Sequence, residues 1–501
     1  MRLYLNSNRV KGTMAEWRFY GRRLELQQLV DIFARNRWFF VKITGRRRIG
    51  KTTLVRNALS TCSSRQIYYV PIPDSGDAGV LSSVSDALDT FQVPEDRFPR
   101  PRTLADLAKL IEALARHGYV VVLDEFQYFN RKAFSEFCSL LQAAIDRLAA
   151  DAERVPGGLV VLGSIHTEMT ALLEDRSAPL YNRITDSIEL THLDIGSVLS
   201  ILRDHADTSP ERLLFLWTLF EGVPKFYRDC FEQQVLAAER RTLLRRIFFE
   251  SSSPLRAEAD NWFLRELRGR YDTVLKFVAR SPGRAHKELV SAIRDVSGDN
   301  TDQIGGYLKA LTERYRLIER KLPVFAPPAA RRSRYYLKDN FLQAWLAALA
   351  NPVAARDFRP IDALVIEADT RLADVEGGAL EKLVGEIYEE RSRKDLGDFP
   401  ITSRITGFWD RSDTEIDLVA VNQEERRLRF GSCKRSPAKL VSDINNFKGH
   451  VDRFLDTFPT YRSWKIEHVG VAPRLDDGAR AVLLRHDVRP QDLDDLTRDL
   501  A

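Results

Sequence analysis

The sequence predicts an α/β protein made of several units, the first of which is a parallel sheet covered by helices. Over the first 195 residues, short apolar runs typical of buried strands alternate with helical patterns. A mainly helical stretch follows, then three short helical patterns with a Pro- and Arg-containing segment, and finally a second set of strands. A chain of 501 residues is too long for one core. We therefore expect a modular architecture.

The composition narrows the class of protein. Apolar residues make up 44% and charged residues 29%, which is typical of a soluble globular protein. Apolar runs such as Tyr119 to Leu123 are too short to span a bilayer, and the N-terminus lacks a signal-peptide core. The four cysteines form no C-x-x-C pair. We expect a cytoplasmic protein without a membrane partner, and the net charge of +5 permits nucleic acid without requiring it.

Five units are expected along the chain. They are an N-terminal extension at 1–17, a first α/β core at 18–195, a helical lid at 196–265, a winged helix-turn-helix at 266–350 and a second α/β domain at 355–501. In the first core the expected strands are 38–43, 66–70, 119–123, 159–162 and 187–190. Helical patterns at 24–33, 52–59 and 105–116 lie between them.

A phosphate-binding loop is expected directly after the first strand. The string from Gly45 to Thr52 fits G-x-x-x-x-G-K-[ST], a spacing at which backbone N–H groups can surround phosphates. The expected nucleotide-binding residues are Gly45, Arg46, Arg47, Arg48, Ile49, Gly50, Lys51, Thr52 and Thr53. Lys51 would bind the β and γ phosphates of ATP, and the hydroxyl of Thr52 would bind Mg²⁺.

Acidic and polar residues follow two later strands. In YVVVLDEFQ, Asp124 ends a buried strand and is expected to hold Mg²⁺, while Glu125 would activate the attacking water. Ser164 follows the next strand and either contacts the γ-phosphate as a polar sensor or caps a helix. Arg183 is a candidate arginine finger for its own subunit or a neighbouring one, or else a surface arginine.

Several of these strings together resemble one known family. FYGRRLEL, GRRRIGKTTL, VVLDEFQ, LGSIHTEM, PLYNR and EGVPKF are similar to those of the archaeal-type ATPases, within the STAND and AAA+-related P-loop NTPases. The resemblance covers about residues 18–350 and implies an ATP-driven switch with a helical lid and a winged helix. It also gives Lys51, Thr52, Asp124 and Glu125 the roles stated above.

The winged helix-turn-helix has two possible uses. Residues 301–314 would be its recognition helix, with Ile304, Leu308 and Leu311 facing the core. Arg331, Arg332 and Arg334 would lie on the wing near DNA phosphates. Alternatively, the unit packs between domains or senses the nucleotide.

The C-terminal pattern resembles the PD-(D/E)xK nuclease superfamily. Glu381 on a helix, Asp417 in Glu415-Ile-Asp417, and Lys434 on a second strand match its helix acid, strand acid and lysine. The resemblance implies that Asp417 binds a metal and that Lys434 stabilises charge or activates water. Ser432 stands where the pattern requires an acid, which removes one metal ligand. A metal-dependent nuclease and a degenerate fold that only binds both remain open.

The leading hypothesis is an Mg²⁺-dependent ATPase that controls a nuclease-like, DNA-interacting C-terminal domain. The alternatives are an ATP-gated regulator or scaffold that binds protein partners, and a true nuclease licensed by ATP. The sequence leaves the oligomeric state open.

Overall fold

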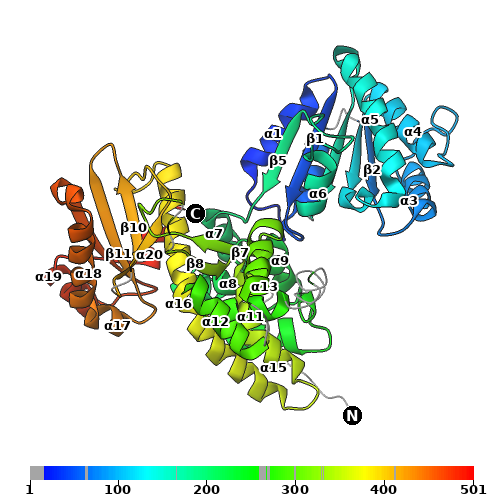
Figure 1. Cartoon of the computed structure of the whole chain (residues 1–501). Coiled ribbons are helices and arrows are strands. Elements are labelled where there is room, and N and C mark those ends of the chain that lie inside the picture. The colour runs from blue at the N-terminus through cyan, green and yellow to red at the C-terminus, as the bar shows by residue number, and fades with distance from the viewer. Residues whose placement is uncertain are drawn as a thin grey trace, which may run out of the picture.

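In this computed structural model the described part of the chain forms two five-stranded sheets joined by a helical region, together with a small three-stranded sheet (Figure 1). The structure describes residues 16–62, 66–164, 166–258, 267, 271–297, 301–328, 330, 332–410 and 413–500. Most of the expected N-terminal extension therefore lies outside the described residues. In the described part of the chain, no helix has both the length and the apolar character needed to cross a membrane.

The first sheet is fully parallel, with strand order β2-β3-β4-β1-β5. Its strands are β1 (Phe39–Gly45), β2 (Gln66–Pro71), β3 (Tyr119–Asp124), β4 (Gly158–Gly163) and β5 (Asp186–Leu190). Each of the five expected strands is present, with ends shifted by no more than two residues. The prediction of a parallel α/β sheet is confirmed.

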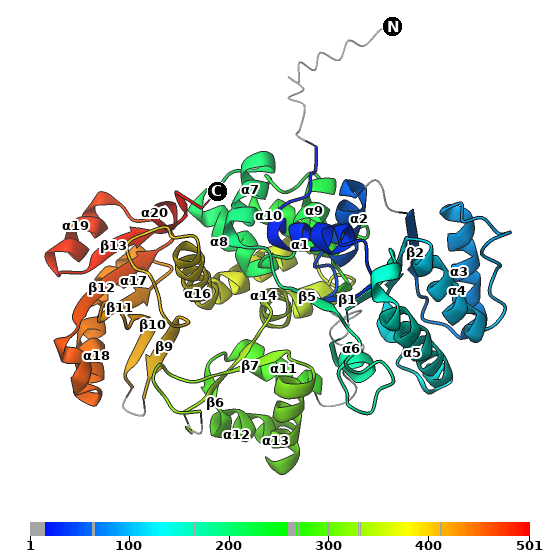
Figure 2. The same cartoon turned by 90° about the horizontal axis from the view of Figure 1, so that it is seen from above.

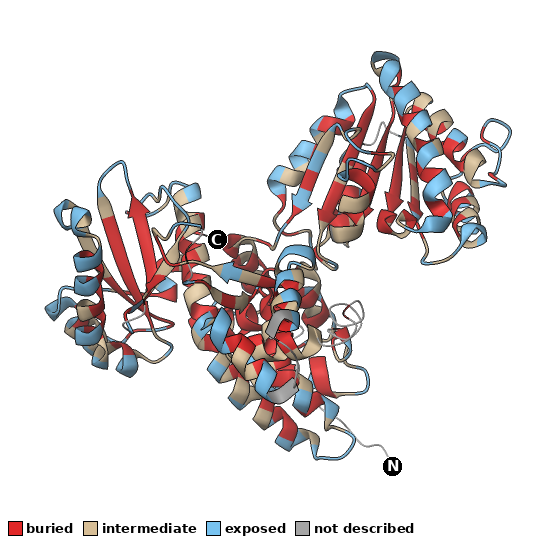
Figure 3. Ribbon diagram, viewed as in Figure 1, coloured by how far each residue is buried: buried red, intermediate tan, exposed pale blue. Residues whose placement is uncertain are grey.

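Helices cover both faces of this sheet, because its central strands are apolar on both sides. They are α1 (Arg23–Ala34), α2 (Lys51–Thr61), α3 (Asp77–Thr90), α4 (Leu104–Arg116), α5 (Ser135–Ala150) and α6 (His166–Leu173), with 3₁₀ turns η1 (Phe126–Phe129), η2 (Lys132–Phe134) and η3 (Ala152–Arg154). Val41 and Val122 pack with α1 and α2 on one face, whereas Val121 and Val161 pack with α4 and α5 on the other. The strands of the sheet are largely buried, and so are the helix faces that pack against them (Figure 3).

A helical region follows the sheet. It contains α7 (Ile195–His205), α8 (Pro210–Phe220), α9 (Pro224–Glu232), α10 (Arg240–Leu244) and η4 (Arg245–Phe249), and later α14 (Asn340–Ala344), η7 (Trp345–Leu349) and α15 (Ala350–Ala354). Pro224 occupies the first turn of α9, where a missing N–H costs no hydrogen bond. The break that the sequence indicates at EGVPKF is therefore the junction of α8 and α9.

Between these two groups lies a unit of three helices and a small antiparallel sheet of order β6-β8-β7. Its elements are α11 (Tyr271–Arg280), β6 (Arg284–Ala285), α12 (His286–Ser297), α13 (Thr301–Lys309), η6 (Ala310–Arg314), β7 (Ile318–Lys321) and β8 (Arg334–Leu337). Ile304, Leu308 and Leu311 are buried, on the side that the sequence indicates. We call residues 322–333, which connect β7 to β8, the wing loop; Arg331 in this loop lies outside the described residues.

The C-terminal sheet is mixed, with order β13-β12-β11-β10-β9. Its elements are β9 (Thr406–Trp409), β10 (Glu415–Asn422), β11 (Arg427–Cys433), α17 (Pro437–Ser442), α18 (Ile444–Thr457), η8 (Pro459–Ser463), β12 (Lys465–Ala472), α19 (Asp477–Arg485), β13 (Arg489–Asp492) and α20 (Leu493–Thr497). Strands β9–β11 are antiparallel, and β11–β13 are parallel.

One long helix, α16 (Ile361–Arg393), joins the helical region to this sheet (Figure 2). The sequence indicates a helix only from about Gly378, but α16 has 33 residues. Leu364 and Leu372 near its start and Leu383 and Ile387 near its end belong to the same hydrophobic cluster as Leu418 of β10. The expected separate C-terminal unit thus shares a core with the rest of the chain.

Candidate nucleotide site and its connection to the C-terminal sheet

The loop from Gly45 to Thr53 connects β1 to the start of α2. Gly50 has a φ of +96°, which a side chain would strain, and directly precedes α2. A Cβ atom at Gly45 would lie 2.5 Å from the carbonyl oxygen of Leu190, so only glycine fits beside β5. Together the glycines bring the loop to the N-terminus of α2, whose free N–H groups favour an anion.

Lys51 points into this loop. Its Nζ donates hydrogen bonds to the carbonyl oxygens of Gly45 at 2.9 Å and Arg46 at 3.0 Å. Burial lowers the pKa of Lys51 to about 8, although the charges of Glu125 and Asp124 act in the opposite direction. The ammonium group is thus partly desolvated in the concave side of the loop, where a phosphate would gain from its charge.

Asp124 at the end of β3 lies beside Thr52. The hydroxyl of Thr52 donates to Asp124 Oδ2 at 2.7 Å, and the backbone N–H of Glu125 donates to Oδ1 at 2.9 Å. The phenol of Tyr69 on β2 also donates to Oδ2. A hydroxyl and a carboxylate held this close form a donor set that fits Mg²⁺.

Glu125, Gln127 and Ser164 form a second polar group next to Asp124. Glu125 has a left-handed backbone with a φ of +56°. Its Oε2 accepts hydrogen bonds from the Gln127 amide and, at 3.2 Å, from the Ser164 hydroxyl. Gln127 Oε1 in turn accepts the Ser164 backbone N–H at 3.3 Å, and the Gln127 residue is only 3% exposed. The structure therefore brings the predicted water-activating acid and the predicted sensor into contact.

Three further residues of the loop differ in burial, and a fourth, Arg48, pairs with acids of the helical region. Ile49 is buried in the core, whereas Arg47 and Thr53 are exposed. Arg48 pairs with Glu258 at 2.7 Å and with Asp229 of α9 at 3.6 Å. These ion pairs attach the loop to the helical region that follows the sheet.

Arg183 lies before the amino-terminal end of β5, whereas the loop follows the carboxyl-terminal end of β1. The last residue of β5, Leu190, is the partner of Gly45. At about 3.3 Å per residue, β5 alone spans roughly 13 Å. Arg183 instead makes a two-pronged ion pair with Asp146 of α5, at 2.8 and 3.0 Å. The structure does not bring Arg183 to the loop of its own subunit.

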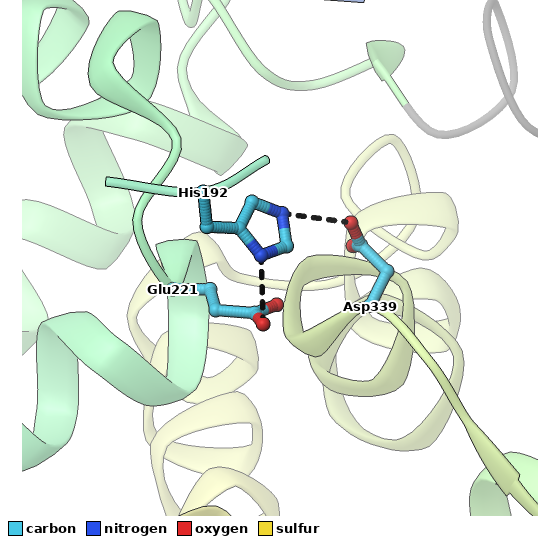
Figure 4. Close-up of side chains that lie close together, drawn as sticks. All are labelled: His192, Glu221 and Asp339. Atoms are coloured by element: carbon cyan, nitrogen blue, oxygen red, sulfur yellow. Dashed lines mark ion pairs between the residues drawn. The ribbon is translucent and has the colours of Figure 1, made fainter. Parts of the chain in front are cut away.

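A partly buried polar cluster connects the loop to α16, and we call it the polar junction. It comprises Arg46, His192, Glu221, Asp339, Asn340 and Lys382. His192 lies between two carboxylates, with Nδ1 2.8 Å from Glu221 and Nε2 3.9 Å from Asp339 (Figure 4). Arg46 pairs with Asp339, and Lys382 lies 2.7 Å from Glu221.

The acidic and basic side chains of the polar junction pair with one another. Glu221 is 3% exposed, and although burial opposes ionisation, His192 and Lys382 hold the pKa of its carboxyl well below the ordinary value. Lys382 Nζ also donates to the carbonyl oxygen of Lys338 and to Asn340 Oδ1. The two acids therefore already have cationic partners, so a metal ion has no unpaired charge to neutralise there.

The predicted residues of the C-terminal site converge at the junction of α16, β10 and β11. Asp417 Oδ2 accepts hydrogen bonds from Lys434 Nζ at 2.9 Å and from the backbone N–H of Cys433 at 2.7 Å. Burial, followed by the charge of Asp417, raises the pKa of Glu381 to about 8. Ser432 is 4% exposed on β11. Asp417 is thus paired with Lys434 and Ser432 supplies no carboxylate, which reduces the set of anionic donors for a divalent cation.

The wing loop and β8 cover one side of this region. Arg334 of β8 pairs with Glu415 and lies 4.8 Å from the ring of Trp409. The indole N–H of Trp409 donates to the carbonyl oxygen of Arg332 at 2.8 Å. The charge of Arg334 is thus paired with Glu415 in this structure, and its contact with DNA phosphates stays a prediction.

A groove of about 1120 Å³ leads to the same residues from another side. Glu381, Lys434, Arg435 and Lys439 line it together with residues of α8 and α10. Arg435 pairs with the buried Glu376 of α16 at 2.6 Å. The C-terminal site thus borders the wing loop and β8 on one side and the groove lined by α8 and α10 on another.

Sequence reasoning missed three side chains that the structure places at these sites. Gln127 stands in the DEFQ string, but its contact with Ser164 depends on the pairing of neighbouring strands. Tyr69 reaches Asp124 because β2 and β3 pair in parallel, with Pro71 opposite Asp124. Lys382 adjoins Glu381 in the sequence, and only the direction of α16 shows that it faces the other way.

Comparisons with known proteins found one matching family model and one relative that covers most of the chain. Residues 19–226 match the model of a family described as an ATPase domain predominantly from Archaea. An uncharacterized protein of Methanocaldococcus jannaschii is 24% identical over 440 residues, which cover 85% of this chain and 91% of that protein.

Two solved structures are similar to part of the chain. The Walker-type ATPase of Pyrococcus abyssi is 17% identical and has a TM-score of 0.49, covering 66% of this chain and 96% of its own. The ORC2 protein of Aeropyrum pernix, in ADPNP and ADP complexes, is 14% identical with a TM-score of 0.45, covering 70% of this chain and 94% of its own.

Proposed function

We propose that the chain is an Mg²⁺-dependent ATPase whose nucleotide state controls its C-terminal sheet, on the basis that residues 19–226 match the model of an ATPase domain family found predominantly in Archaea. The observation that carries this proposal is that the polar junction links the phosphate loop to α16 through a series of direct contacts. One of its residues, Arg46, is part of the phosphate loop, and another, Lys382, is next to Glu381 on α16.

In the proposed reaction the loop holds the phosphates and the acids serve the attacking water. Backbone N–H groups of the loop and Lys51 bind the β and γ phosphates. Mg²⁺ supplies charge neutralisation when it is bound by Thr52 and Asp124. Glu125 accepts a proton from water as the water oxygen bonds to the γ-phosphorus and the bond to the β-phosphate oxygen breaks, which releases ADP and phosphate. Ser164 contacts the γ-phosphate, and Arg183 acts on the site of a neighbouring subunit.

The nucleotide state reaches α16 through the polar junction. Phosphate in the loop competes with Asp339 for Arg46, because both are anions that bind a guanidinium group. A change at Asp339 affects Asn340 directly, since Asp339 is the N-cap of α14 and accepts the N–H of Leu342 at 2.9 Å. Asn340 contacts Glu221 and Lys382. A shift of Lys382 moves its neighbour Glu381 relative to Asp417.

The unit of residues 271–337 serves as a winged helix that packs against the C-terminal sheet. Support comes from its order of three helices and three strands and from the Arg334–Glu415 ion pair. In the resting state this packing holds Glu415, which lies two residues before Asp417, and covers one side of the C-terminal site.

DNA is the proposed partner of the C-terminal sheet, and the observed contacts favour binding over cleavage. Lys434 neutralises Asp417, and Ser432 offers no carboxylate. A protein partner is the second candidate, because the groove near Glu381 mixes acidic and basic side chains and lacks the single sign of charge typical of a nucleic-acid site.

Hydrogen exchange with and without ATP tests the switch. In the wild type, ATP and Mg²⁺ should change amide exchange in residues 376–390 and 415–434, and Lys51→Ala should abolish this change. The double variant Glu221→Gln with Lys382→Met removes both charges together, which avoids a lone buried ion. It should still hydrolyse ATP but lose the response of the C-terminal sheet.

Lys439→Met is the matched control, because Lys439 is an exposed lysine of the same region. It should keep the full response. An unchanged response in the double variant would refute the proposed route through the polar junction.

Binding and cleavage assays on single-stranded and duplex DNA, with ATP and either Mg²⁺ or Mn²⁺, identify the partner. Salt-sensitive binding without cleavage supports the proposal. Cleavage that is lost in Asp417→Ala would establish a nuclease instead. Neither binding nor cleavage would favour a protein partner.

A further inference from the structure

We propose that Tyr69 and Gln127 are positioning residues for ATP hydrolysis, Tyr69 acting through Asp124 and Gln127 acting through Glu125. Neither residue belongs to the phosphate loop or to the pair of acids. The proposal rests on the roles that the proposed function gives to Asp124 and Glu125. Its test distinguishes a failure of the positioning roles from a failure of the proposed function.

Tyr69 completes a set of three donors around Asp124. Oδ1 accepts the N–H of Glu125, whereas Oδ2 accepts the hydroxyls of both Thr52 and Tyr69. If Thr52 turns its oxygen toward a metal ion, Tyr69 remains as a donor that keeps the carboxylate in place. Donors behind a metal ligand set its orientation, and their loss typically lowers metal affinity about 10–100-fold.

The ring of Tyr69 is fixed from the side of α2. The guanidinium carbon of Arg56 lies 5.5 Å from the ring centroid, which is a cation–π distance. Tyr68, its neighbour on β2, points to the other face of the sheet, where its hydroxyl donates to the carbonyl oxygen of Val84 at 2.7 Å. The strand thus offers two hydrogen-bonded tyrosines, of which only one contacts the site.

Gln127 fixes the carboxylate of Glu125. Its amide nitrogen donates to Glu125 Oε2, and its amide oxygen accepts the N–H of Ser164. Oε2 also accepts the Ser164 hydroxyl, so the bonds to Glu125 gather on one oxygen. The other oxygen, Oε1, is then the one directed to water. Because Gln127 is 3% exposed, its side chain has little freedom to adopt another position.

Two variants test the two roles through different measurements. Tyr69→Phe should reduce the gain in ATP affinity that Mg²⁺ provides by about tenfold, measured by calorimetry in Mg²⁺ and in EDTA. At saturating Mg²⁺ its kcat should remain near that of the wild type. Gln127→Met removes the amide at similar volume, so kcat should fall about tenfold or more while KM and the ATP affinity stay unchanged.

Each variant is a control for the other, and Tyr68→Phe controls for the loss of a tyrosine hydrogen bond from the same strand. Tyr68→Phe should lower thermal stability without changing either measurement. If Tyr69→Phe keeps the full effect of Mg²⁺ on affinity, or Gln127→Met keeps its kcat, that role is refuted. A uniform loss of all measured quantities in a variant would show a purely structural role and would also overturn it.

Asp124→Asn and Glu125→Gln distinguish this result from a failure of the proposed function. If Asp124→Asn keeps the Mg²⁺ effect and Glu125→Gln keeps hydrolysis, the assigned roles of the acids are wrong. If both lose these properties while Tyr69→Phe and Gln127→Met do not, only the positioning roles fail.

Discussion

Glu381 is a carboxyl whose ionisation the fold opposes. Burial and the charge of Asp417 raise its pKa from 4.5 to about 8. Between these values the folded chain binds more protons at Glu381 than the unfolded chain does, so this group lowers stability as pH rises through the window. In EDTA, Glu381→Gln should therefore gain more stability over the wild type at pH 8 than at pH 5, by at most about 4 kcal/mol. Denaturant unfolding at both pH values measures this.

The matched control at the residue scale is Asp374→Asn, which removes one negative charge from the same helix. Its difference from the wild type should not depend on pH in the same way. If Glu381→Gln and Asp374→Asn give equal differences at pH 5 and pH 8, Glu381 is not held in its neutral form.

At the scale of the element, α16 is continuous through two adjacent glycines. A Cβ atom at Gly377 or Gly378 would have no heavy atom within 4 Å. Glycine costs about 1 kcal/mol relative to alanine inside a helix. Gly377→Ala and Gly378→Ala should therefore each raise the free energy of unfolding by about 0.5–1 kcal/mol, as measured in denaturant.

Gly50→Ala provides the contrast, because the φ of +96° at this position strains any side chain. It should lower stability. A loss of stability in the α16 variants would show that the glycines serve a close approach by another group. The helix is continuous because Leu364 and Leu372 are buried against the helical region, and tertiary packing outweighs the local cost of glycine.

At the scale of the whole molecule, the wing loop connects the middle unit to the C-terminal sheet. Phe325 stacks on Tyr461, with ring centroids 4.6 Å apart and planes 14° apart, and contacts Phe454 and Phe458. The N–H of Val324 donates to the carbonyl oxygen of Gly407 at 2.9 Å. Phe325→Ala should lower stability by about 2 kcal/mol and increase hydrogen exchange at residue 324.

Phe358→Ala is the control for the loss of a phenylalanine, since Phe358 is 88% exposed. It should change stability by less than about 0.5 kcal/mol. If Phe325→Ala also has so small an effect and leaves exchange at residue 324 unchanged, the wing loop does not hold the two units together.

Local sequence was sufficient for the parallel sheet and for the position of the phosphate loop. Five runs rich in apolar residues correspond to β1–β5; the central strands β3 and β4 are apolar along their whole length because they are buried on both faces, whereas the edge strands β2 and β5 alternate. Gly45, Gly50 and Lys51 could be placed because a phosphate loop requires these residue types at fixed spacing within one short segment. The roles assigned to Asp124, Glu125 and Ser164 stay predictions, although the structure places them together.

The tertiary structure decided which distant residues meet. Tyr69 contacts Asp124, and Lys382 contacts Glu221, through strand order and helix direction that no short string of sequence contains. Packing likewise paired Arg183 with Asp146 and Arg334 with Glu415, whereas the sequence indicated an arginine finger for the first and a contact with DNA phosphates for the second. A motif fixes its residues through adjacent backbone, but a contact across many residues depends on how the apolar faces of whole elements are buried together.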